Sequence, residues 1–177
     1  TLFLLAGLAP SAVKADYRLS AHCQGNSWST CFILFDGEIE DGLYEHMTEM
    51  LEEYDYPNIF LNSPGGDLGE ALRVGRLIRQ QNRDTAIGLL KSIPNDPLAY
   101  VSDMPNQTLG SCESACAYMF LGGVKRNLVW DPKSQGMGLG FHRFYLRDGR
   151  LSSDFAQQAS AVVVEYLVEM GIDARLF

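Results

Sequence analysis

Residues 58–72 contain a predicted strand that turns directly into a predicted helix. The apolar run 59–61 is typical of a buried strand, and residues 63–66 read Ser-Pro-Gly-Gly. Beyond the turn, apolar or small residues recur with helical spacing at Leu68, Ala71, Leu72, Gly75 and Ile78. Paired glycines allow backbone conformations that other residues avoid. The turn either presents amide groups to a bound anion at a helix start, or it is a tight connection without a ligand.

Apolar runs and amphipathic segments alternate along most of the chain. The apolar runs predict strands at 32–35, 59–61 and 85–90. Helical spacing predicts helices at 43–54, 68–78, 114–123 and 155–170. This alternation predicts an α/β fold with a largely parallel sheet. With 177 residues, 46% of them hydrophobic, the chain is long enough for a single domain with one core.

The charge pattern excludes several classes of partner. The formal net charge is −8 and no block of Lys or Arg reverses it locally, so nucleic acid is not expected to bind. Gly136, Gly138 and Gly140 precede a predicted strand rather than a helix, so they do not indicate a dinucleotide site. No cofactor and no metal site are expected.

The N-terminal segment indicates export. Residues 1–10 are apolar but too few to span a bilayer. Val13-Lys14-Ala15 follows, with small residues at the two positions that a signal peptidase reads. We interpret 1–15 as the remnant of a signal peptide and 16–177 as the domain, in preference to an ordinary buried segment at 1–10. This predicts a periplasmic or secreted protein without a stable membrane span after cleavage.

The four cysteines fall into two close pairs. Cys23 and Cys31 bracket a turn-rich stretch, and export favours a disulfide between them. Closing that loop would stabilise the fold by about 2–3 kcal/mol. Cys112 and Cys116 are four residues apart, and helical geometry would put their Cα atoms about 6 Å apart, within disulfide range. They are either a second disulfide or two buried thiols.

Two polar residues stand out in apolar surroundings. Ser114 opens a nearly all-apolar predicted helix, where its hydroxyl is either exposed to a cleft or an ordinary helix N-cap. His142 lies in an apolar predicted strand, where a neutral imidazole is costly without a partner. It is either a base for Ser114 or a core histidine bonded to a carbonyl. Residues 91–110 have no sustained periodicity and end beside Ser114, so we expect a loop that covers the site.

The order and spacing of these motifs resemble the proteolytic subunit of Clp protease. The shared elements are a Ser-Pro-Gly-Gly turn, a Ser that opens an apolar helix, and a His in the following strand. The resemblance covers roughly residues 32–172 and is strongest to exported Clp-like proteins of bacteria. It implies the fold of the Clp protease/crotonase superfamily, with repeated βαβ units.

The resemblance also implies roles for individual residues. It implies that Ser114 is the nucleophile and His142 the general base. The implied oxyanion donors are Gly66, Asp67 and Ala115.

The chain departs from the family pattern in three places. Residues 91–110 are inserted before the nucleophile, and Cys112-Glu113 replaces the usual small residues. The position of the third triad acid maps just beyond Phe177, which suggests a C-terminal truncation. Asp173 is close to that position in the sequence but does not match the family pattern.

These features predict a serine hydrolase, peptidase-like, that acts on a peptide or protein through an acyl-enzyme. A homo-oligomer is possible for this family. One alternative is a non-catalytic exported domain of the same fold that binds a peptide or protein partner. Another is a Ser–Lys enzyme similar to signal peptide peptidase, with Lys125 or Lys133 as the base.

Overall fold

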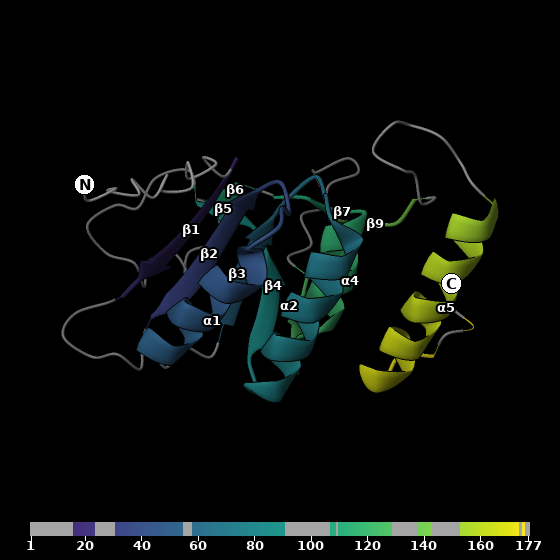
Figure 1. Ribbon diagram of the computed structural model, residues 1–177. Coiled ribbons are helices and arrows are strands. Elements are labelled where there is room, and N and C mark those ends of the chain that lie inside the picture. The colour runs from purple at the N-terminus through teal and green to yellow at the C-terminus, as the bar shows by residue number, and fades with distance from the viewer. Residues whose placement is uncertain are drawn as a thin grey trace, which may run out of the picture.

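The computed structural model describes residues 16–23, 31–54, 58–90, 107–108, 110–128, 138–142, 153–173 and 175. Within them a mostly parallel sheet packs against helices, which confirms the predicted α/β fold (Figure 1). The strands are β1 (Tyr17–His22), β2 (Phe32–Gly37), β3 (Asn58–Asn62), β4 (Asp84–Ile87), β5 (Leu89–Leu90), β6 (Gln107–Thr108), β7 (Cys112–Glu113), β8 (Arg126–Asn127) and β9 (Leu139–Gly140). The helices are α1 (Leu43–Glu53), α2 (Leu68–Gln80), α4 (Ala115–Leu121) and α5 (Ser153–Glu169).

The main sheet has the order β1-β2-β3-β4-β8. Strand β1 pairs antiparallel with β2, and the other neighbours run parallel. Two further strand pairs are not counted in this sheet, β5 with β6 antiparallel and β7 with β9 parallel.

Both faces of the central strands are buried. Ile33, Phe35, Ile59 and Leu61 belong to the main core beneath the helices. A second cluster consists of Phe32, Leu34, Phe60 and Ala86. Strands that are buried on both faces appear in the sequence as unbroken apolar runs, and this explains why 32–35 shows no polar alternation.

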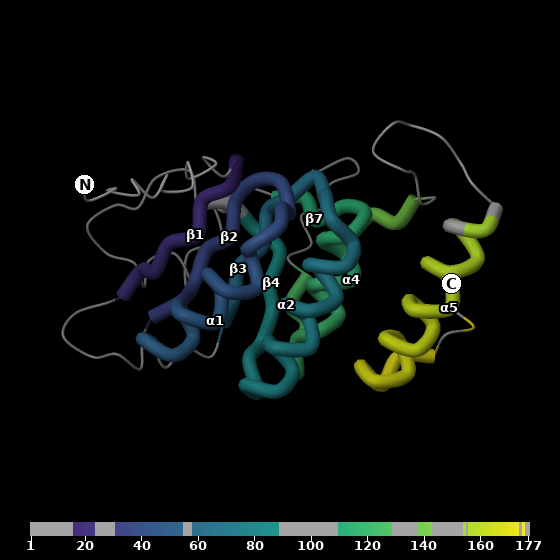
Figure 2. The backbone as a smooth tube through the Cα atoms, in the orientation of Figure 1, coloured from purple at the N-terminus to yellow at the C-terminus, as the bar shows by residue number. Residues whose placement is uncertain are grey.

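Helix α2 lies between α1 and α4 (Figure 2). The backbones of α2 and α4 approach so closely that a Cβ on Gly122 would lie 2.3 Å from the carbonyl oxygen of Gly75. Gly75 also faces Tyr166 of α5, and a Cβ there would lie 1.9 Å from the tyrosine hydroxyl. That hydroxyl donates to the carbonyl of Tyr118 at 2.8 Å. Burial raises the pKa of Tyr166, so the hydroxyl remains a donor into strongly alkaline solution.

Arginines join the C-terminal ends of α4 and α5. Arg79 donates to the carbonyls of Gly122 at 3.0 Å and Gly123 at 2.7 Å. Arg126 donates to the carbonyls of Leu121 at 2.9 Å and Met170 at 2.8 Å. The last carbonyls of a helix have no partner within the helix, so these guanidinium groups satisfy them.

Both cysteine pairs form disulfides. Cys23–Cys31 joins the end of β1 to the start of β2, as predicted. Cys112–Cys116 is also bonded, which decides between the two alternatives for that pair.

Several boundaries differ from the sequence-based predictions. The strand predicted at 85–90 is divided at Gly88 into β4 and β5. The segment predicted as a loop at 91–110 contains β6, which pairs with β5, the two residues that precede the segment. Residues 91–106, the proposed signal-peptide remnant 1–15 and Lys133 lie outside the described residues. Among the helices that the structure describes, none is long and apolar enough to cross a membrane.

Replacing Tyr166 with Phe removes a buried hydroxyl and leaves the Tyr118 carbonyl without its donor. We expect Tyr166→Phe to lower the free energy of unfolding by about 1–2 kcal/mol. Tyr17→Phe is the matched control, since the Tyr17 hydroxyl contacts His46 at 3.4 Å near the surface, and it should cost less than about 0.5 kcal/mol. Urea unfolding followed by circular dichroism measures both; equal losses would contradict the described docking of α5.

Candidate active site

Ser114 occupies a sharp turn between β7 and α4. Its backbone angles are φ 57° and ψ −124°. This combination lies outside the regions that residues with side chains favour, and such conformations cost about 1–3 kcal/mol. Hydrolases of the α/β class expose their nucleophilic serine on a strained strand-to-helix turn of the same kind.

The alternative that Ser114 is an ordinary N-cap does not fit the structure. An N-cap residue normally has an extended backbone, and its side chain accepts a hydrogen bond from the helix. Ser114 has a positive φ and makes no such bond to α4, a helix that is described in full. Its hydroxyl therefore does not cap α4.

Strand β7 is held on both of its edges. On one edge the amide of Ser63 donates to the carbonyl of Ser111 at 2.7 Å, and the carbonyl of Ser63 accepts from the amide of Glu113 at 3.0 Å. On the other edge the amide of Ser114 donates to the carbonyl of Gly140 at 2.7 Å. The strand that precedes Ser114 is thus bonded to the end of β3 and to β9.

The Pro-Gly-Gly turn lies against Ser114. A Cβ on Gly65 would lie 2.7 Å from the Ser114 Cβ and 3.2 Å from the Ala115 nitrogen. A Cβ on Gly66 would lie 2.2 Å from the carbonyl oxygen of Ile39. Both glycines have positive φ, 107° and 136°. A glycine is therefore needed at both positions. At residue 65 a side chain would collide with Ser114, and at residue 66 it would collide with the backbone of Ile39, which follows β2.

The bonds around the glycine turn distinguish among the predicted oxyanion donors. The amide of Ile39 donates to the carbonyl of Gly65 at 2.7 Å, and the amide of Asp67 donates to the carbonyl of Ile39 at 2.8 Å. In such a parallel bridge the amide of the middle residue, Gly66, points to the side away from Ile39. The amide of Ala115 is in the first turn of α4, where amides have no partner within the helix. The amide of Asp67 is already bonded, so this geometry speaks against its predicted role.

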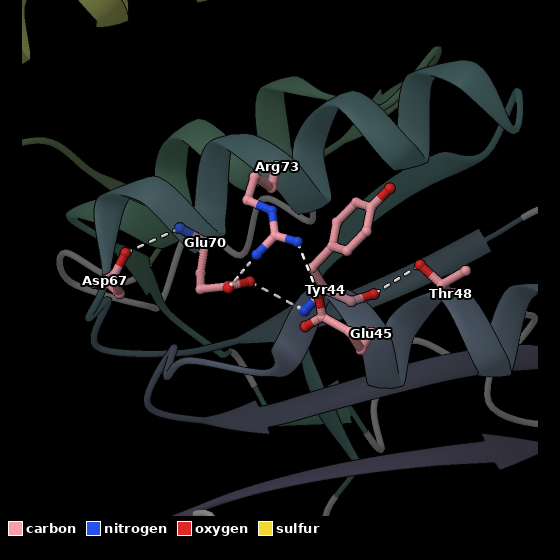
Figure 3. Close-up of polar contacts among 6 residues, drawn as sticks. All are labelled: Tyr44, Glu45, Thr48, Asp67, Glu70 and Arg73. Atoms are coloured by element: carbon pink, nitrogen blue, oxygen red, sulfur yellow. Dashed lines mark hydrogen bonds and ion pairs between the residues drawn. The ribbon is translucent and has the colours of Figure 1, made fainter.

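Asp67 instead belongs to a polar network that fixes the starts of α1 and α2 (Figure 3). Its carboxylate accepts from the amide of Glu70 at 2.9 Å and caps α2. The Glu70 carboxylate, 5% exposed, accepts from the amide of Tyr44 at 3.1 Å and from Arg73 at 2.7 Å. Arg73 also bonds Glu45 at 2.8 Å and lies over the Tyr44 ring. This network anchors the helix that follows the glycine turn.

His142 follows β9, which runs beside β7. The register pairs Cys112 with Leu139 and Glu113 with Gly140, so the residues just before His142 are adjacent to the Ser114 turn. Phe141 packs edge-on against Tyr118 of α4, with ring centroids 5.4 Å apart. His142 itself is exposed. The alternative of a buried core histidine is therefore wrong, as is the extension of a strand through this residue.

Two further candidate groups, Lys125 and Asp173, lie within the described residues, whereas Lys133 does not. Lys125 follows the far end of α4, and a helix of this length separates the two by about 10 Å. Asp173 bonds the side chain of Arg175, and this interaction lowers the pKa of its carboxyl group. Sequence reasoning missed Ser63 and Gly65, although the Ser-Pro-Gly-Gly sequence could have indicated both.

No protein-family model matches the chain, and no curated protein matches it in sequence. Solved structures do match it. The catalytic domain of ClpP protease from Plasmodium falciparum aligns with TM-score 0.51 and 14% identity, over 81% of this chain and 68% of that one. ClpP1 from Listeria monocytogenes aligns with TM-score 0.51 and 16% identity, over 82% and 75%. A point mutant of that ClpP1 gives TM-score 0.54 and 15% identity, over the same shares. The chain therefore has a ClpP-like fold.

Proposed function

We propose that this protein is a serine hydrolase of the peptidase type, with Ser114 as nucleophile and His142 as general base. The observation that carries the proposal is the Ser114 turn. A serine that does not cap its helix is held at a positive φ, directly against a glycine turn. The likeness in fold to proteases is consistent with this chemistry, although function depends on the site rather than the fold.

The proposed reaction assigns one role to each of these groups. His142 takes the proton of the Ser114 hydroxyl while Oγ attacks the carbonyl carbon of the substrate. The amides of Gly66 and Ala115 donate to the oxyanion that forms. His142 then protonates the leaving amine, and a water molecule, activated in the same way, hydrolyses the acyl-enzyme.

The setting of the enzyme is part of the proposal. Two disulfides in one small domain favour an oxidising compartment, hence a periplasmic or secreted protein. The substrate class is a peptide or protein, and assembly into a homo-oligomer stays an expectation.

A fluorophosphonate ester that phosphonylates activated serines tests the proposal directly. We expect the purified protein to be labelled at Ser114, and Ser114→Ala to abolish labelling. His142→Ala should slow labelling about 1,000-fold or more, since removing the base disables the nucleophile. Ser160→Ala, on the exposed face of α5, is the matched serine control and should be labelled at the wild-type rate. A wild-type protein that is folded but unlabelled would favour a non-catalytic binding domain.

The close approach of Gly65 to Ser114 gives a second prediction. Gly65→Ala introduces a Cβ that collides with the Ser114 side chain, and this should slow labelling about tenfold or more by displacing the hydroxyl. Gly42→Ala is the control, because Gly42 also has a positive φ, 90°, but open space around its Cβ position. Backbone strain should cost both variants about 1 kcal/mol of stability, and Gly65→Ala should lose more because its Cβ also meets the Glu113 carbonyl oxygen at 2.9 Å. Equal labelling rates in the two variants would contradict the described contact.

A further inference from the structure

We propose that the Cys112–Cys116 disulfide is a positioning device for the nucleophile, so that Ser114 reaches full reactivity only in the oxidised chain. This inference rests on the proposed function of Ser114. The disulfide joins the residue two positions before Ser114 to the residue two positions after it. Cys112 belongs to β7 and Cys116 to α4, so the bond crosses from the strand to the helix around the serine.

The turn needs such a constraint because Ser114 has an unfavourable backbone conformation, φ 57° and ψ −124°. Conformations of this kind persist only where the surroundings over-determine them. The elements on either side are short, since β7 has two residues and α4 has seven. Without a further link, the chain could relax by extending the turn or by adding Ser114 to the helix.

The disulfide and the strand bonds together exclude both relaxations. A fully extended chain would separate the Cα atoms of Cys112 and Cys116 by about 13 Å, whereas the bond holds them at 5.1 Å. The bonds of Cys112 to Gly138 and of Glu113 to Ser63 keep β7 extended, which prevents the helix from growing backwards. The chain must then reverse direction between residues 113 and 115, and Ser114 is the residue at the reversal.

The disulfide lies in the hydrophobic core, beneath the Ser114 turn. Cys112 and Cys116 are both 0% exposed and belong to the main core, so the bond is shielded from a substrate at the surface. Forming the bond removes two electrons and two protons from the thiols and passes them to a disulfide oxidant, which becomes two thiols. The proposed site would therefore be assembled by oxidation after export.

The second disulfide provides a matched control. Cys23–Cys31 joins β1 to β2 at the edge of the main sheet and does not involve β7 or α4. Removing either disulfide should reduce stability, but only the loss of Cys112–Cys116 should disturb Ser114. We would compare Cys112→Ala/Cys116→Ala, Cys23→Ala/Cys31→Ala and the wild type.

The first measurement is fluorophosphonate labelling, with the maximal rate and the half-saturating concentration determined separately. We expect Cys112→Ala/Cys116→Ala to lower the maximal rate about 10-fold to 100-fold, the cost of misplacing a reacting group by about 1 Å. The half-saturating concentration should not change, since probe binding does not use the disulfide. Cys23→Ala/Cys31→Ala should keep the wild-type rate. A wild-type maximal rate in the folded Cys112→Ala/Cys116→Ala variant would overturn the inference.

The second measurement does not depend on activity. Amide hydrogen exchange at residues 114–117 should become at least about tenfold faster in Cys112→Ala/Cys116→Ala, because local opening is no longer restrained. It should be unchanged in Cys23→Ala/Cys31→Ala. If no protein is labelled, the proposed hydrolase function fails, and exchange alone decides the inference. Unchanged exchange at 114–117 would overturn it.

If Cys112→Ala/Cys116→Ala does not fold, the same disulfide can be opened and closed reversibly by chemical reduction and reoxidation. The Cys23→Ala/Cys31→Ala variant contains only the Cys112–Cys116 disulfide, so dithiothreitol can reduce no other bond in it. Reduction, confirmed by thiol counting, should slow labelling and speed exchange at 114–117, and reoxidation with oxidised glutathione should restore both. A fully reduced, folded chain with unchanged labelling and exchange would count against the proposal.

Discussion

The contact between the glycine turn and the serine turn is the constraint on which the candidate site depends. The glycine turn follows β3, and the serine turn follows β7. Ser63 bonds the end of β3 to β7, which brings the two turns into register. At that distance no side chain fits at Gly65, because its Cβ would lie 2.7 Å from the Ser114 Cβ. The carboxyl ends of parallel strands are where α/β folds bind ligands, and this pair of turns lies at such an edge.

Helix α4, which begins next to Ser114, is fixed at both of its ends. At its start, Cys116 is bonded to the strand that precedes it. At its end, Arg79 and Arg126 bond its last carbonyls and link them to α2, β8 and α5. Every residue of the helix is buried. A nucleophile at the start of such a helix has little freedom to move, which suits a reaction that depends on orientation.

The sequence predicted those parts of the fold that local residues determine. The glycine turn, the helices and the buried strands β2 and β3 follow from short-range patterns. Strand β1 was not predicted, because it is defined by pairing with β2 and by a disulfide between them. The exposure of His142 and the capping role of Asp67 were also missed. The cap made by Asp67 is local, since its carboxylate accepts from the amide of Glu70 three residues further on, and the Asp-x-x-Glu spacing could have indicated it. The exposure of His142 depends instead on which segments pack beside it, which a local pattern does not encode.

Two neighbouring helix starts show what distinguishes a structural residue from a candidate functional one. Asp67 and Ser114 both precede a helix at the end of a strand, and both are residue types that cap helices well. Asp67 has φ −68°, and its carboxylate accepts from the amide of Glu70, so its side chain stabilises α2. Ser114 has φ 57°, and its side chain makes no capping bond to α4. A fold under selection for stability alone would favour the cap at both positions. The strained serine is therefore the residue whose conformation calls for an explanation in function.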